Sequence, residues 1–201
     1  MSETSSIPER PPRSMSLAEW AALDEDESGE LVDGQLEEEE VPDCIHEGIV
    51  IWLAVKLRNW MAGRGGFIGG SEARFAVSAR RGRKPDLFAY LPGGRLPPRR
   101  GVVHTPPDIM VEVLSTEPRD IRRDRVAKMD EYARFGVRYY WIVDPQVRSL
   151  EIFELVAGGL YLHRLGATDG TVEEVPGCQG LSLDLDELWS EIDRLEPEAG
   201  A

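Results

Sequence analysis

The stretches PDLFAY (residues 85–90) and IMVEVL (residues 109–114) decide the predicted fold, because each has the composition of a buried β-strand. Each also carries one carboxylate, Asp86 in the first stretch and Glu112 in the second, where an apolar strand has no structural use for a charge. Burying a lone carboxylate costs several kcal/mol unless a cation or hydrogen-bond donors compensate for it. We therefore expect a positive group beside these two residues, either a divalent metal ion or Lys128.

The segment that follows the Glu112 strand is predicted to be a helix over residues 120–135, ended by Gly136. Asp124, Lys128 and Tyr132 recur every four residues and so share one face of this helix. A second interpretation of Asp124 and Lys128 is an ordinary ion pair on a helix surface, which contributes roughly 0.3 to 0.5 kcal/mol.

The N-terminal half is predicted to contain a short helix over residues 17–23, a β-hairpin over residues 30–37 and a long amphipathic helix over residues 43–61. The hairpin prediction rests on an Asp-Gly turn between two short alternating segments, and Glu30 begins its first strand. His46 lies in the first turn of the long helix, close to its apolar stripe. A satisfied structural histidine and a residue that leans toward a site are both open interpretations of His46.

The remaining elements follow from strand patterns, turn residues and one last helical pattern. Strands are predicted at residues 67–68, 72–77, 86–91 and 138–145, a hairpin at residues 150–155 and 160–165, and a helix at residues 185–195. Residues 80–84 are interpreted as a basic loop, and residues 92–107 as a long loop rich in Gly, Pro and Arg.

A length of 201 residues, with 41% hydrophobic and 30% charged residues, is typical of one soluble domain. We expect that domain to span residues 16–195, between a disordered tail at residues 1–15 and a short tail at residues 196–201. The longest apolar run, residues 49–55, is too short to cross a membrane, so a cytoplasmic protein without a membrane partner is expected. Two cysteines do not make a disulfide framework in a chain of this length.

The charge of the chain is unevenly distributed along the sequence. The net charge is −14, but residues 56–138 hold 18 Lys and Arg against 9 Asp and Glu, which gives this segment a charge of +9. Phosphate neutralisation by basic side chains supplies most of the non-specific affinity for nucleic acid. We therefore interpret Arg80, Arg81, Arg83 and Lys84 as candidate nucleic-acid contacts, with plain solvated surface charge as the open alternative.

Taken together, the motifs resemble the Uma2-like family, a domain of unknown function in the PD-(D/E)XK nuclease superfamily. The resemblance runs from about Leu17 to Leu188. It rests on several short motifs in a fixed order: Glu30 in its hairpin, His46 at the start of the long helix, Pro85-Asp86, Glu112-Val113-Leu114-Ser115, then Asp124, Lys128, Tyr132, Gly136-Val137 and the strand Tyr140 to Asp144.

The resemblance implies an α/β fold with a restriction-endonuclease-like core, in which a mixed β-sheet is flanked by helices and an additional C-terminal β-hairpin follows. It also implies a metal site made by Asp86, Glu112, Glu30 and the carbonyl of Val113, with Mg²⁺ as the cofactor and Mn²⁺ as an alternative. The superfamily's motif lysine would stand at position 114, which is Leu114 here, so the resemblance implies that Lys128 supplies the ammonium group.

The function that the resemblance implies is Mg²⁺-dependent hydrolysis of DNA phosphodiester bonds, with Asp86, Glu112, Lys128 and Glu30 as the catalytic residues. His46, Asp124 and Tyr132 would be accessory residues, and a homodimer would be in keeping with the family. The competing interpretation is a non-catalytic module of the nuclease fold that binds nucleic acid or a protein partner. In that case the carboxylates would only pair with Arg or Lys.

Overall fold

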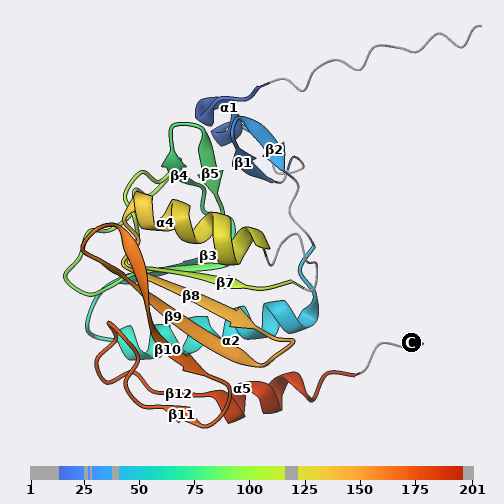
Figure 1. Cartoon of the computed structure of the whole chain (residues 1–201), viewed down its shortest axis with the longest axis vertical. Coiled ribbons are helices and arrows are strands. Elements are labelled where there is room, and N and C mark those ends of the chain that lie inside the picture. Colours follow the sequence, from blue (N-terminus) through green and yellow to red (C-terminus); the bar gives the residue numbers. More distant parts are fainter. Residues whose placement is uncertain (1–13, 25–26, 28, 38–40, 116–121, 197–201) are drawn as a thin grey trace, which may run out of the picture.

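The structure is a computed structural model that describes residues 14–24, 27, 29–37, 41–115 and 122–196. A six-stranded mixed sheet forms the centre of the protein (Figure 1). Its strand order is β10-β9-β8-β7-β6-β3. The strands are β3 (Phe67–Gly70), β6 (Leu87–Tyr90), β7 (Ile109–Val113), β8 (Tyr139–Asp144), β9 (Ser149–Val156) and β10 (Leu160–Ala167). Strands β7 and β8 pair in parallel, and the other neighbours in this sheet pair antiparallel.

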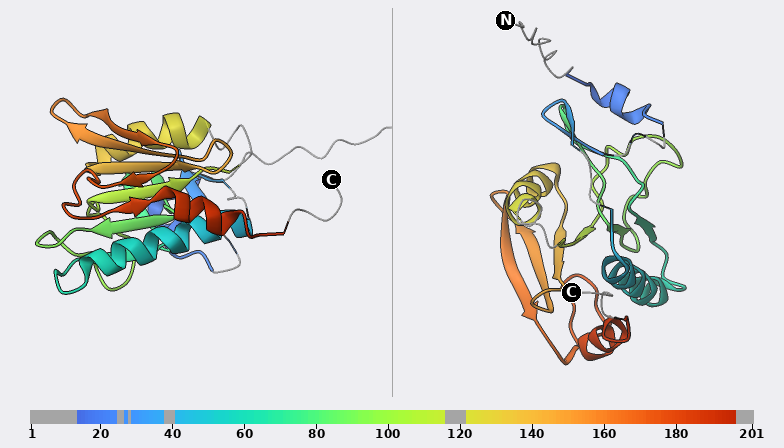
Figure 2. Two further views of the ribbon diagram at one scale, coloured as in Figure 1. Left: turned by 90° about the horizontal axis from the view of Figure 1, so that it is seen from below. Right: turned by 90° about the vertical axis from the view of Figure 1, so that its right-hand side faces the viewer.

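Helices cover both faces of this sheet. Helix α2 (Cys44–Met61) and helix α5 (Leu185–Ile192) pack on one face (Figures 1 and 2). The opposite face is covered by a continuous helical segment that connects β7 to β8, made of the π-helix η1 (Arg123–Lys128) and the α-helix α4 (Met129–Phe135). The predicted α/β fold with a mixed sheet flanked by helices is confirmed.

Alternation along the strands distributes side chains between two cores. In β7, Ile109, Val111 and Val113 join the core beneath α2 and α5, whereas Met110 joins the core beneath α4. Glu112 has the same parity as Met110, so the period of two places its carboxylate on the α4 face. Asp86, just before β6, shares parity with Phe88, which also lies in the α4 core. The two carboxylates therefore belong to one face of the sheet.

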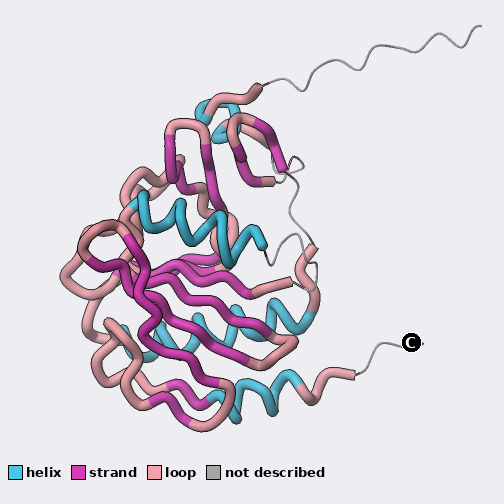
Figure 3. The backbone as a smooth tube through the Cα atoms, in the orientation of Figure 1, coloured by secondary structure: helices cyan, strands magenta, loops and turns pink. Residues whose placement is uncertain are grey.

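A smaller sheet with the order β2-β1-β5-β4 lies at the end of the molecule that carries helix α1 (Leu17–Ala21), as Figure 3 shows. Its strands are β1 (Glu30–Val32), β2 (Gln35–Glu37), β4 (Phe75–Ser78) and β5 (Arg81–Arg83). The side chain of Trp20 in α1 is fully buried against Gly82, where a Cβ atom would lie 2.3 Å from the indole ring. A glycine at this position lets the N-terminal helix dock on β5.

The interpretation of residues 80–84 as a loop is wrong, because Arg81–Arg83 forms strand β5 between β1 and β4. A pattern of Arg-Gly-Arg gives no strand signal, and pairing with two neighbours overrides the weak local preference. The other predicted strands, helices and hairpins are present with ends that differ by a few residues. The short pair β11 (Thr171–Val172) and β12 (Leu183–Asp184) was not predicted.

The helix predicted over residues 120–135 is helical from residue 122, but residues 123–128 form a π-helix rather than an α-helix. Short π-helical segments are rare and occur often at functional sites. Most of the two predicted tails and most of the turn at residues 115–118 lie outside the described residues. Within the described ranges, no helix has the length and apolar character that a membrane span requires.

Candidate active site

A cavity of about 750 Å³ opens at the end of the sheet where the first residue of β1, the start of α2, the end of β7 and helix η1 meet. Eight of the residues proposed from the sequence line this cavity: Glu30, His46, Lys84, Asp86, Glu112, Val113, Asp124 and Lys128. These residues are separated by up to 98 positions in the sequence, and the fold collects them around one space.

Glu112 lies in the wall of the cavity with 2% of its surface exposed. Lys128 Nζ donates a hydrogen bond to Glu112 Oε2 at 2.7 Å, and Tyr132 Oη donates to Oε1 at 2.6 Å. Burial raises the pKa of Glu112 well above its usual range, and the nearby charges of Asp86 and Asp124 raise it further, although Lys128 opposes them. The charge of Lys128 alone thus does not offset the burial of Glu112 and the charges of its acidic neighbours.

Lys128 lies at the centre of the polar cluster and is 3% exposed. Its ammonium group contacts three carboxylates, Glu112 at 2.7 Å, Asp124 at 3.1 Å and Glu30 at 3.6 Å. Burial alone would lower the pKa of Lys128, but these three carboxylates raise it above its ordinary value. Lys128 is therefore a permanent cation at the cavity wall, and the interpretation of Asp124 and Lys128 as a surface ion pair is wrong.

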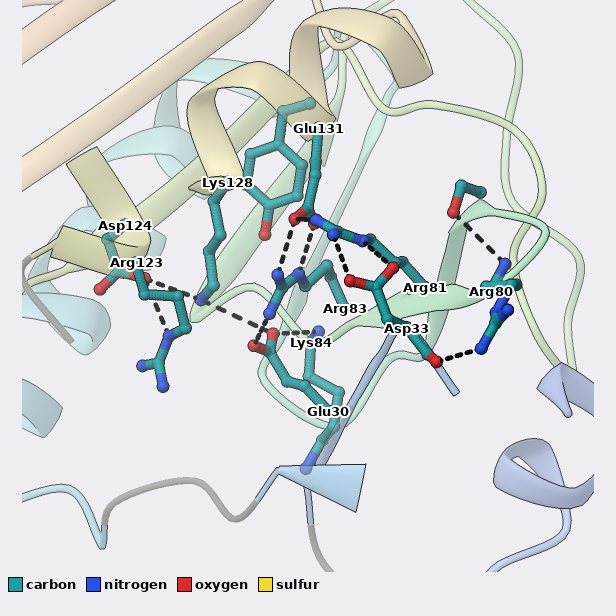
Figure 4. A network of polar contacts seen from close by, with 12 residues as sticks. Glu30, Asp33, Arg80, Arg81, Arg83, Lys84, Arg123, Asp124, Lys128 and Glu131 are labelled. Atoms are coloured by element: carbon teal, nitrogen blue, oxygen red, sulfur yellow. Dashed lines mark hydrogen bonds and ion pairs between the residues drawn. The ribbon is translucent and has the colours of Figure 1, made fainter. Parts of the chain in front are cut away.

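Glu30 is held by a second buried cation, Arg83, as Figure 4 shows. Arg83 Nη1 donates to Glu30 Oε2 at 2.6 Å, and the backbone N–H of Lys84 donates to Glu30 Oε1 at 3.0 Å. Burial disfavours the charged form of Glu30, but Lys128 and Arg83 outweigh it and lower the pKa of this carboxyl to about 2. Glu30 therefore stays ionised inside an internal ion-pair network.

Asp86 is more accessible, with 18% of its side chain exposed. The backbone N–H of Val113 donates to Asp86 Oδ2 at 2.7 Å, and His46 Nε2 lies 3.1 Å from the same oxygen. Burial lowers the pKa of His46, but the hydrogen bond and the charge of Asp86 more than offset this and raise it above its ordinary value. His46 thus reaches the site from the first turn of α2, and its contact fixes the orientation of Asp86.

The four candidate nucleic-acid contacts do not form one exposed basic surface. Arg83 and Lys84 are buried, with 1% and 7% of their surface exposed. Arg81 is bound by the carboxylates of Asp33 and Glu131, and Arg80 remains exposed beside the Asp33 carbonyl. Pairing with acidic residues distant in sequence accounts for the positions of Arg81 and Arg83.

The arrangement of oxygen atoms fits a metal ion held by two carboxylates better than one held by three. Glu30 and Glu112 each have both oxygens engaged by protein donors, but Glu30 pairs with two cations, Arg83 and Lys128, whereas Glu112 pairs with Lys128. Across the described ranges, no three His, Cys, Asp or Glu side chains converge closely enough to hold an ion. Mg²⁺, however, commonly binds through one or two carboxylates and keeps several waters. Asp86 and Glu112, together with the space of the cavity, fit that requirement.

Two important members of the cluster were not predicted from the sequence to belong to it. Glu131 was assigned no role, and Arg83 was interpreted as a nucleic-acid contact. Arg83 Nε and Nη2 donate to the two oxygens of Glu131 at 2.7 and 2.9 Å. Glu131 follows Lys128 by three residues and therefore faces the same side of the helical segment. That spacing was the available signal for Glu131, whereas nothing local marks Arg83.

Comparison with known proteins gives a consistent assignment. A family model named Uma2, described as "Putative restriction endonuclease", matches residues 16–186. The fold is similar to the crystal structure of a "putative nuclease belonging to DUF820" from Anabaena variabilis, with a TM-score of 0.69 and 17% sequence identity over 88% of this chain and 98% of that chain. No protein of curated function matches the chain. Because the match to the family model extends over most of its length, the protein belongs to the Uma2 family of restriction-endonuclease-like proteins.

Proposed function

We propose that this protein is a Mg²⁺-dependent endonuclease that hydrolyses phosphodiester bonds in DNA, with Asp86 and Glu112 as the metal ligands and Mn²⁺ as an alternative metal. The observation that carries the proposal is the buried carboxylate of Glu112, which lines the same cavity as the carboxylate of Asp86. A bound divalent ion would lower the pKa of a water and stabilise the charge that develops on the phosphate.

The residues of the chain have distinct roles in this proposal. Val113 contributes its backbone N–H to orient Asp86, and its carbonyl is a candidate third ligand. Tyr132 and Lys128 each hold one oxygen of Glu112. The ammonium of Lys128, which is charged throughout the physiological pH range, adds positive potential beside the position of the reacting phosphate.

The proposal is tested by cleavage of supercoiled plasmid DNA by the purified protein with Mg²⁺ or Mn²⁺. We expect wild-type protein to nick or linearise the plasmid only when a divalent metal is present. Glu112→Gln and Asp86→Asn should lower the rate at least about 100-fold, because each replaces a carboxylate ligand of the metal ion that would stabilise the charge developing on the phosphate. The matched control is Asp130→Asn, an exposed aspartate on the outer face of α4. Metal-dependent cleavage by the Glu112→Gln protein at the wild-type rate would refute the proposal.

A second candidate, a non-catalytic binding module, is favoured by one observation. Glu30 and Glu112 are both paired with internal cations, Arg83 and Lys128, as expected when carboxylates serve only the fold. On this account the wild-type protein would bind DNA or a protein without cleaving DNA under any metal condition. Asp86 argues against it, because its side chain pairs with His46 rather than with either of these two cations and lines the cavity.

A further inference from the structure

Arg83 joins three elements that are distant in sequence. Its guanidinium has 1% of the side chain exposed and donates to Glu30 of β1 through Nη1. Through Nε and Nη2 it binds both oxygens of Glu131 of α4. A planar guanidinium suits this task, because its donors form a rigid fork that matches a carboxylate geometry. Arg83 thereby fixes β1 and α4 relative to β5.

The contacts continue from Glu30 to the lysine of the candidate active site (Figure 4). Glu30 Oε1 lies 3.6 Å from Lys128 Nζ, and the same ammonium contacts Glu112 and Asp124. Glu131 is three residues after Lys128 on the same helical segment. The contacts therefore form a closed ring. Glu131 binds Arg83, Arg83 binds Glu30, Glu30 contacts Lys128, and the helical segment joins Lys128 to Glu131.

We propose that Glu30, Arg83 and Glu131 are positioning residues that hold the Lys128 ammonium against Glu112. The catalytic part of this role rests on the proposed nuclease function, whereas the positional part does not. A lysine side chain is a flexible stem with a compact charge, so its location depends on partners around it. The ring supplies such a partner from β1, in addition to Glu112 of β7 and Asp124 of η1.

The sequence offers a direct way to measure the position of Lys128, because the chain contains only three lysines, Lys56, Lys84 and Lys128. Acetylation of the folded, metal-free protein by a limiting amine-reactive ester, followed by peptide mass spectrometry, reports each lysine separately. Lys56 lies in α2 and pairs with Glu187 of α5, away from the ring, and serves as the internal reference. In the wild type we expect Lys128 to be acetylated far more slowly than Lys56.

Two variants and one control test the ring. Arg83→Met removes the fork and its charge, and Glu131→Gln weakens one side of the ring while Arg83 keeps Glu30 as a partner. If Arg83→Met does not fold, Glu131→Gln still provides the test. The control is Arg134→Met, which removes an exposed arginine from the outer face of α4. All proteins are labelled well below their melting temperatures, so that global unfolding does not contribute.

Release of Lys128 from the ring should raise its acetylation relative to Lys56 by about tenfold or more in the Arg83→Met and Glu131→Gln proteins, because local opening exposes the amine. Arg134→Met should leave the ratio unchanged. In the cleavage assay, the same two variants should lower kcat about 10- to 100-fold with little change in KM, since misplacement of a catalytic group slows the chemical step.

An unchanged acetylation ratio in folded Arg83→Met and Glu131→Gln proteins would overturn the positioning role, and so would an unchanged kcat in both. A lower melting temperature of the variants, with the acetylation ratio and kcat both unchanged, would mean that the ring is purely structural. That result would also overturn the positioning role. If the wild-type protein does not cleave DNA at all, the proposed function fails, while the acetylation ratios still decide whether the ring positions Lys128.

Discussion

Two ion pairs with the same spacing lie on the helical segment between β7 and β8. Asp124 and Lys128 approach to 3.1 Å, and Asp130 and Arg134 approach to 2.9 Å, and the partners of each pair stand four positions apart in the sequence. The first pair has 4% of each side chain exposed and lines the cavity. The second has 57% and 76% exposed and faces solvent. The spacing alone does not distinguish them.

The difference teaches that burial, rather than pairing, determines what such a pair does. The exposed pair is solvated and screened, so its removal has little effect on the free energy of unfolding. The buried pair shares its lysine with Glu112 and Glu30, so its removal leaves charges in a region of low dielectric constant. Burying several charges beside a cavity costs free energy, so the buried cluster is a candidate for function. The outer pair is exposed and carries no such cost.

The largest expected effect is on stability when the buried cation is removed. Lys128→Met should lower the free energy of unfolding by about 3 to 5 kcal/mol, because the buried carboxylates of Glu112, Asp124 and Glu30 lose their shared partner. Urea denaturation at pH 7 without metal measures this change. A loss no larger than that of Arg134→Met would remove the energetic distinction between the two pairs.

The next largest effect is expected on the free energy of unfolding at acidic pH, to which ionised Glu30 contributes. In the folded protein the pKa of Glu30 is about 2, below its ordinary value of 4.5, so ionised Glu30 stabilises the fold fully above pH 4.5. That stabilisation, about 3 kcal/mol at most, should be lost as the pH falls from 4.5 to 2. Urea denaturation of the wild type and of Glu30→Gln across this window should show a flatter pH dependence for the variant. Parallel curves would contradict the shifted pKa.

The smallest effect is expected at the exposed pair. Asp130→Asn should lower the free energy of unfolding by roughly 0.3 to 0.5 kcal/mol at low ionic strength, because Arg134 loses a solvated partner. In 1 M NaCl the difference from wild type should vanish, since the screening length falls to about 3 Å. An effect that persists in high salt would mean that this pair is not screened as its exposure implies.

The strands of the large sheet could be predicted because their side chains alternate between two apolar cores, and that alternation is present in the sequence. Strand β5 could not be predicted, since Arg81 to Arg83 has no apolar alternation and becomes a strand only by pairing with β1 and β4. The same applies to the burial of Arg83, whose partners lie 53 and 48 residues away in the sequence. Long-range pairing leaves no local signal.

The candidate site was predicted in composition but not in arrangement. Asp86 and Glu112 were identifiable as carboxylates in apolar strands, and the resemblance to a family supplied Glu30, His46 and Lys128. The sequence could not reveal that Glu30 turns toward Arg83 and Lys84, because the direction of a side chain depends on contacts across the fold. The spacing alone could not separate Lys128 from Arg134, since each stands four residues after an aspartate.

The central claim is that Asp86 and Glu112 form a site that needs a divalent cation, and melting curves of the wild type and Asp86→Asn test it most directly. The charge of Asp86 disfavours ionisation of Glu112, so Asp86→Asn should raise the metal-free melting temperature, by about 2 to 4 °C if about 1 kcal/mol is gained. Millimolar Mg²⁺ or Mn²⁺ should raise the melting temperature of the wild type and of the control Asp130→Asn, but not of Asp86→Asn. A lower metal-free melting temperature for Asp86→Asn, with no response of the wild type to either metal, would contradict the account.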